Sequence, residues 1–164
     1  MKAHEYLAQT HITAKEGIDL VYLHLGLIGE VGEVTELFKK MLRDDGGMMT
    51  EERLRKLELE LGDVLWYWSE LRRNFDVFIG SPPYSEYVMR TMRDKDVREL
   101  VVVLAENAAG VPDIPNVALQ RVFSAIETLC NRFDLNVETV MEKNSEKLLR
   151  RLAENKISGS GSDR

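Results

Sequence analysis

Two short acidic stretches of the chain carry residue types at a spacing that could do chemistry. The first reads GEVGE and contains Glu30 and Glu33, and the second reads ELGD and contains Glu60 and Asp63. A spacing of three places both carboxylates of a pair on one helix face, about one turn apart. Four such charges repel one another, so either the two helices do not face each other here or a hard divalent cation lies between them. Ligands that are all oxygens favour Mg²⁺, Mn²⁺ or Ca²⁺.

The surroundings of both pairs differ from those of an ordinary solvated helix face. Apolar residues flank them, as in residues 25–28 before the first pair and residues 64–66 after the second, where a solvated face would show Lys and Arg. Gly26, Gly29 and Gly32 recur every three residues inside a helical pattern. Each glycine costs about 1 kcal/mol of helix stability relative to alanine. Such a cost predicts the close approach of another backbone or of a ligand.

Three segments carry a family resemblance, namely residues 26–40 (GLIGEVGEVTELFKK), 60–67 (ELGDVLWY) and 144–151 (NSEKLLRR). Together they resemble the MazG-like nucleoside triphosphate pyrophosphohydrolases of the all-α NTP pyrophosphatase superfamily. The resemblance covers roughly residues 18–76 and 129–151. It implies hydrolysis of a nucleoside triphosphate to the monophosphate and pyrophosphate, with Mg²⁺, or Mn²⁺ in its place, held by the four catalytic carboxylates.

Helical geometry indicates which cations could meet a triphosphate. At 100° per residue, Lys40 falls within about 20° of Glu33, whereas Lys39 points to the other side. Three polar residues of the last predicted helix share a face at spacings of three and four; with the resemblance they become candidates for phosphate or sugar contacts: Asn144, Lys147 and Arg151.

The predicted reaction needs a divalent metal, an oriented water and cations on the phosphate oxygens. A carboxylate that the metal does not fully engage could orient or deprotonate the water. The spacing does not choose that carboxylate. Three consecutive aromatic residues, Trp66, Tyr67 and Trp68, point in three directions, so at least one must lie in the core. Tyr67 shares a helical stripe with Asp63, and Trp66 is adjacent to it.

Apolar periodicity and capping residues predict the helices that position these side chains. The caps are Thr50, Asp96 and Asn136, and Asp96 has capping-box spacing with Glu99. The predicted helices cover residues 3–15, 18–42, 51–75, 97–109, 117–133 and 137–153. Apart from a hairpin pattern around residues 77–90, no strand-like alternation appears. The fold class is therefore all-α, and the resemblance implies a four-helix-bundle-like core with an inserted helical segment.

The chain has 164 residues and 44% apolar composition, enough for one domain with a core. We expect that domain to cover residues 1–154. Residues 77–118 form an insertion relative to the compact family pattern, which could be a lid, an oligomer interface or decoration. Residues 155–164 are rich in Gly and Ser and predict a flexible tail.

Charge and composition limit the kinds of partner that the protein is expected to have. A net charge of −6 argues against binding to a nucleic-acid backbone, but not against a nucleotide whose charge is met by metal. The single cysteine, Cys130, excludes an intrachain disulfide and predicts a buried apolar position in a reducing compartment. No stretch approaches the ~20 apolar residues of a membrane span. The sequence therefore predicts a cytoplasmic protein without a membrane partner.

Two other functions compete with the enzyme. A di-iron carboxylate bundle would need Glu-x-x-His on two helices, and the chain has none. A non-catalytic α-helical oligomerisation module would use the acidic pairs only structurally. Apolar residues in segments 101–105 and 122–129 exceed what one small four-helix core would consume, which predicts a homodimer or a tetramer. The resemblance implies the same.

Overall fold

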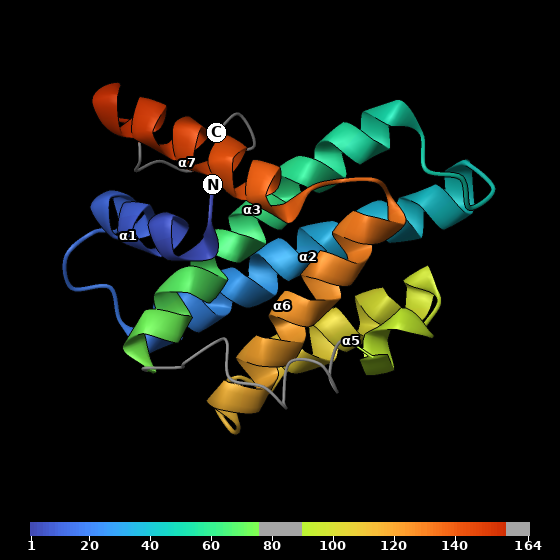
Figure 1. The fold of residues 1–164 in the computed structure, drawn as a ribbon, viewed down its shortest axis with the longest axis horizontal. Coiled ribbons are helices and arrows are strands. Elements are labelled where there is room, and N and C mark those ends of the chain that lie inside the picture. Colours follow the sequence, from blue (N-terminus) through green and yellow to red (C-terminus); the bar gives the residue numbers. More distant parts are fainter. Residues whose placement is uncertain (76–89, 157–164) are drawn as a thin grey trace.

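The helical periodicity of the sequence is realised as an all-α fold (Figure 1). The computed structural model describes residues 1–75 and 90–156, and regular structure there is helical. The helices with defined bounds are α1 (Ala3–Thr13), α2 (Leu20–Asp44), α3 (Glu51–Asn74), α5 (Val97–Ala109), α6 (Pro115–Arg132) and α7 (Val137–Ala153). The predicted fold class is confirmed.

Side-chain caps begin three of these helices at the residues that the sequence singled out. The Thr50 hydroxyl accepts a hydrogen bond from the Arg53 amide at 3.3 Å. Asp96 and Glu99 form a reciprocal capping box in which each side chain accepts from the other residue's amide at 2.9 Å. Asn136 caps α7. Because each cap satisfies amides that the first turn leaves unpaired, these helix starts follow from local sequence.

The turn between α2 and α3 sets the two helices side by side. Gly46 and Gly47 adopt positive φ angles of 61° and 83°, a conformation that ends α2. Arg53 in the first turn of α3 pairs with Asp45, and it lies 3.6 Å from the Asp44 carboxylate. The two helices therefore run antiparallel and pack along their length (Figure 1).

The remaining helices pack around this pair (Figure 1). Helix α7 contacts α1 and α3, whereas α5 pairs with α6 and also packs against α2. Trp68 of α3 lies in the core, where its indole N–H donates to the Leu119 carbonyl at 2.9 Å and its ring stacks on Phe123. This arrangement brings α1 and α7, which are far apart in sequence, together against α3.

Helix α5 belongs to the same core as the other helices. Its Leu100 and Leu104 are fully buried, so this helix, which lies within the segment expected as an insertion, contributes to the core. The expected hairpin pattern around residues 77–90 lies outside the described residues, except for residue 90. So does most of the expected flexible tail, residues 157–164.

The apolar segments expected to drive self-association are mostly used by the chain's own core. Val101 is only 6% exposed, and Leu104, Val122, Ile126 and Leu129 are fully buried. Most apolar residues of these segments are therefore consumed where α5 and α6 pack against each other and against α2 and α3, but Val102 is 54% exposed. The expected self-association stays a prediction.

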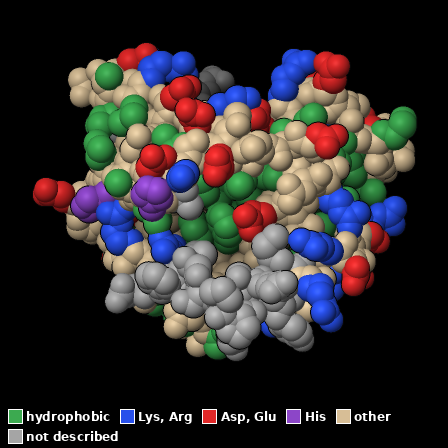
Figure 2. Space-filling model, viewed as in Figure 1, with side chains coloured by type: hydrophobic (Ala, Val, Ile, Leu, Met, Phe, Trp, Pro, Cys, Tyr) green, Lys and Arg blue, Asp and Glu red, His purple; other side chains and the backbone are tan. Residues whose placement is uncertain are grey.

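The molecular surface is charged and mixed. On the face drawn in Figure 2, Asp and Glu side chains lie among Lys and Arg side chains, with hydrophobic side chains between them. None of the helices in the described ranges is both long enough and apolar enough to cross a membrane. Cys130 is buried in α6, and burial raises the pKa of its thiol to about 12. The predicted buried position of this cysteine is confirmed.

Candidate metal centre

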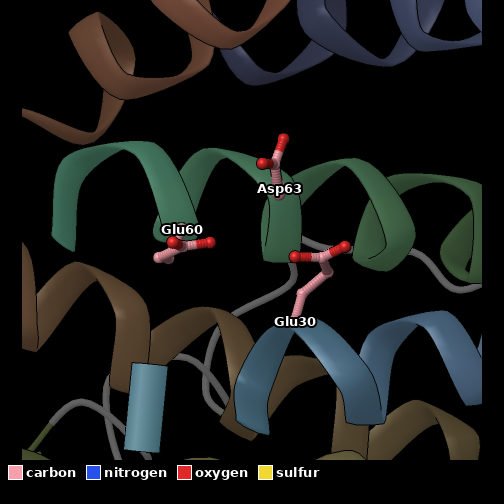
Figure 3. Close-up of side chains that lie close together, drawn as sticks. All are labelled: Glu30, Glu60 and Asp63. Atoms are coloured by element: carbon pink, nitrogen blue, oxygen red, sulfur yellow. The ribbon is translucent and has the colours of Figure 1, made fainter. Parts of the chain in front are cut away.

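Three carboxylates from two helices converge between α2 and α3. Glu30 projects from α2, and Glu60 and Asp63 project from neighbouring turns of α3 (Figure 3). Each offers one carboxylate oxygen, and these oxygens lie within 4.8 Å of one another. All three side chains are partly buried. The structure thus brings together three of the four acidic residues that the spacing singled out.

Glu33 does not join this group. Its side chain is exposed, although it lies only one turn beyond Glu30 on α2. The buried face of α2 is formed by Leu27, Val31 and Val34, and Glu33 lies at the edge of that face. Four carboxylates were expected in the cluster, but only three of them lie in it. The orientation of α2 against α3 leaves Glu33 facing solvent.

Burial and mutual repulsion make the cluster unfavourable for negative charge. Burial, followed by the charges of Asp63 and Glu60, raises the pKa of Glu30 from 4.5 to about 7. The pKa of Glu60 is also raised, first by burial and then by Asp63. A cation among these oxygens would reverse the repulsion. The close all-oxygen donor set and the raised pKa values therefore fit a hard divalent ion such as Mg²⁺ or Mn²⁺.

Helix α7 supplies two nitrogen donors to the same carboxylate. Asn144 Nδ2 donates to Asp63 Oδ1 at 2.9 Å, and Lys147 Nζ forms an ion pair with that same oxygen. A Cβ on Gly62 would lie 3.0 Å from Asn144 Cβ, so glycine in the ELGD stretch allows α7 to approach. With Oδ1 engaged by both donors, Asp63 Oδ2 would be the oxygen left to hold a metal.

The three glycines of α2 have different surroundings. A methyl group on Gly26 would overlap the ring of Tyr67, whereas one on Gly29 or Gly32 would meet nothing within 4 Å. Another backbone or a ligand was expected to approach, but at Gly26 the close neighbour is the Tyr67 side chain. Among the described residues no atom approaches Gly29 or Gly32 in this way, and the approach of a ligand there stays a prediction.

The three consecutive aromatic residues of α3 point in different directions and therefore lie in different surroundings. Trp68 is a core residue, and the Trp66 indole N–H donates to Thr13 Oγ1 at 2.9 Å, which ties α3 to α1. Tyr67 lies beside the carboxylates, and burial, Tyr22, Glu30 and Asp63 raise its pKa. Of the three aromatic residues, Tyr67 is therefore the one that lies near Glu30 and Asp63.

The predicted cations differ in where the structure places them. Lys147 contacts the cluster, but Lys40 and Lys39 both pair with Glu36, with Lys40 Nζ at 3.3 Å. Lys40 follows Glu30 by ten residues, which is about 15 Å along a helix. Arg151 is partly buried one turn beyond Lys147 on α7. Asn144 and Lys147 are thus brought to the carboxylates, whereas Lys40 is not.

One residue that reaches the site could not be predicted from the sequence. Tyr6 of α1 is fully buried, and its hydroxyl donates to Asn144 Oδ1 at 2.7 Å. In the sequence it appears only as an apolar residue of a weakly amphipathic helix. No spacing links it to Asn144, which lies 138 residues further along the chain.

Comparisons with known proteins identify a relative but no family. No family model matches the chain, and no solved structure matches it. The Gene 37 protein of Mycobacterium phage L5 is 44% identical over 62 residues, which are 38% of this chain and 54% of that protein. The chain thus spans about half the length of this relative. Because its name states no activity, function has to be argued from the site.

Proposed function

We propose that the protein is a Mg²⁺-dependent nucleoside triphosphate pyrophosphohydrolase, which cleaves between the α- and β-phosphates to release pyrophosphate and the monophosphate. The observation that carries this proposal is the convergence of Glu30, Glu60 and Asp63 from two antiparallel helices. The resemblance of the surrounding segments to MazG-like enzymes supplies the substrate class.

The carboxylates would hold the cation, with Asp63 contributing the oxygen that α7 leaves free. A bound divalent ion neutralises triphosphate charge and makes a coordinated water more acidic. Glu30, whose pKa is about 7 without a cation, gives up its proton when the site is loaded. Glu33, exposed at the edge of the cluster, is the carboxylate available to orient the attacking water.

Cationic and polar side chains complete the site. Lys147, only 17% exposed and already beside Asp63, is placed to donate to non-bridging phosphate oxygens. Two further cations would meet other parts of the triphosphate. They are Arg151, one turn further along α7, and Lys40 on α2. Tyr67 offers a ring face to the nucleoside.

An exposed apolar face on α2 supports self-association, which we propose as a homodimer. Val21, Leu25 and Ile28 recur at helical spacing and are 68%, 64% and 41% exposed. This face also favours the alternative of a non-catalytic oligomerisation module. The di-iron alternative has no support in the described residues, because the carboxylate group there includes no histidine. We place the protein in the cytoplasm, in keeping with its single buried cysteine.

A turnover screen tests the proposal. Each common (d)NTP is incubated with the protein in Mg²⁺ and, separately, in excess EDTA, and pyrophosphate and monophosphate are quantified. We expect both products in equal amounts from at least one nucleotide, only with metal. Release of orthophosphate and a nucleoside diphosphate would contradict the proposed bond cleavage. A lack of turnover across a screen that also includes modified nucleotides would favour the oligomerisation module.

A further inference from the structure

Tyr6 joins α1 to the carboxylate cluster through a buried chain of hydrogen bonds. Its hydroxyl donates to Asn144 Oδ1 at 2.7 Å and lies 3.4 Å from the Gly62 carbonyl oxygen. Asn144 Nδ2 in turn donates to Asp63 Oδ1 at 2.9 Å. Tyr6 is fully buried and Asn144 is 4% exposed, so water has little access to compete for these groups.

The direction of this chain is set by what each group can donate. A carboxylate accepts hydrogen bonds only, so the amide must turn its NH₂ towards Asp63 and its oxygen towards Tyr6. The phenol then has to be the donor, and burial keeps it protonated by raising its pKa well above 10. A flipped amide would set its oxygen against the Asp63 carboxylate, which has no hydrogen to donate.

The packing leaves Asn144 little room to move away. The missing Cβ of Gly62 is what admits the Asn144 side chain, whose Cβ and Nδ2 lie 3.0 Å and 3.1 Å from the position that a Cβ would take. The side chain is therefore confined against α3. The orientation of the amide is then held from both ends, by Asp63 at its NH₂ and by Tyr6 at its oxygen.

We propose that Tyr6 is a positioning residue for the metal centre: by donating a hydrogen bond to the Asn144 amide oxygen, it helps to hold the amide in the orientation in which its NH₂ donates to Asp63. Asp63 Oδ1 is thereby held by α7, and Oδ2 would remain for a cation. This role rests on the proposed metal-dependent function. It gives the otherwise weakly amphipathic α1 a part in the site although it contributes no carboxylate.

Tyr6→Phe tests the proposal, because it keeps the buried ring and removes only the hydroxyl. The matched control is Ser69→Ala, which removes another buried hydrogen bond between α1 and α3, that of Thr10 Oγ1 with Ser69 Oγ at 2.8 Å. Each variant is examined as metal-free full-length protein by NMR of the Asn144 side-chain amide. Mn²⁺ affinity and NTP turnover are then measured on the same preparations.

In the wild type we expect the Asn144 NH₂ protons to exchange slowly with solvent. In Tyr6→Phe they should exchange faster, with Mn²⁺ affinity or kcat about tenfold lower, the range typical of residues that orient metal ligands. Ser69→Ala should leave all three quantities unchanged. Tyr6→Phe should also add no further loss in an Asn144→Ala background, because it acts through that amide.

Three results would overturn the proposal: fast exchange of the Asn144 amide in the wild type, wild-type behaviour of Tyr6→Phe, or equal effects of Tyr6→Phe and Ser69→Ala. The wild-type exchange measurement needs no variant, so it remains decisive even where Tyr6→Phe folds poorly. Exchange and Mn²⁺ affinity are read without substrate. A protein that hydrolyses no nucleotide but shows the selective Tyr6→Phe effect would refute the proposed reaction and support the positioning role.

Discussion

The two acidic pairs have the same spacing but different surroundings. On α3, both Glu60 and Asp63 reach the cluster, whereas on α2 only Glu30 does and Glu33 faces solvent. A third helix adds to this difference, since α7 engages Asp63 of the α3 pair through two donors, whereas Glu33 of the α2 pair is exposed. Spacing places two side chains on one helix face, but the neighbouring helices decide which of them are confined.

Asp63→Asn should have the largest effect, because Asp63 belongs to the cluster and also to the contact with α7. The substitution keeps the size of the side chain but removes the charge that Lys147 and the cation both need. We expect kcat/KM for pyrophosphate release to fall by about 100- to 1,000-fold. Circular dichroism should show an unchanged helical fold. Full activity in a folded variant would remove Asp63 from the mechanism.

Glu30→Gln and Glu33→Gln compare the confined and the exposed member of the α2 pair. We expect each to lower turnover by about 100-fold, but for different reasons. Loss of Glu30 should raise the Mg²⁺ concentration needed for half-maximal activity. Loss of Glu33 should lower kcat with an unchanged Mg²⁺ requirement. If the two Mg²⁺ titrations shift equally, the distinction between the two residues fails.

Substitutions of three lysines test whether the effect on turnover follows contact with the carboxylate cluster or only the side of the helix on which the lysine lies. Lys147→Met should cost about 2–4 kcal/mol of transition-state stabilisation, since Lys147 already lies beside Asp63. Lys40→Met should cost less, and Lys39→Met almost nothing. Steady-state kinetics of the three variants gives the order directly. A larger loss at Lys39 than at Lys40 would mean that the direction assigned to this part of α2 is wrong.

The raised pKa of Glu30 predicts how stability depends on pH without metal. An unfolded glutamate loses its proton near pH 4.5, whereas folded Glu30 keeps it until about pH 7. The folded state therefore binds more protons in this window, and the free energy of unfolding should fall as pH rises through it. Urea denaturation in EDTA measures the slope. Saturating Mg²⁺ or Glu30→Gln should reduce it, and a slope unaffected by either would contradict the assignment.

Alanine substitutions of the α2 glycines should have the smallest effects, and their effects on stability should differ in sign. Gly29→Ala and Gly32→Ala should each stabilise the chain by about 0.5–1 kcal/mol, because a methyl group there meets open space. Gly26→Ala should instead destabilise it, since Tyr67 would have to move. Thermal unfolding distinguishes these outcomes. Stabilisation together with lost turnover at Gly29 or Gly32 would indicate that a ligand approaches there.

Local features of the fold could be read from the sequence, and long-range features of the site could not. Thr50, Asp96 and Asn136 begin their helices because a cap depends on neighbours within a few residues. The exposure of Glu33 depends on how α2 rotates against α3, which no spacing along one helix determines. The contact of Tyr6 with Asn144 needs α1 and α7 to meet, and both have sequences compatible with many neighbours.

Mn²⁺ binding to the metal-free protein, followed by electron paramagnetic resonance, tests the central claim that Glu30, Glu60 and Asp63 form a metal centre. Wild type should bind Mn²⁺, and Mg²⁺ should displace it. Glu60→Gln and Asp63→Asn should each weaken binding by at least about tenfold. Glu36→Gln, which removes an exposed carboxylate of α2 outside the cluster, should bind as wild type does. Equal Mn²⁺ affinity in all four proteins would contradict the account.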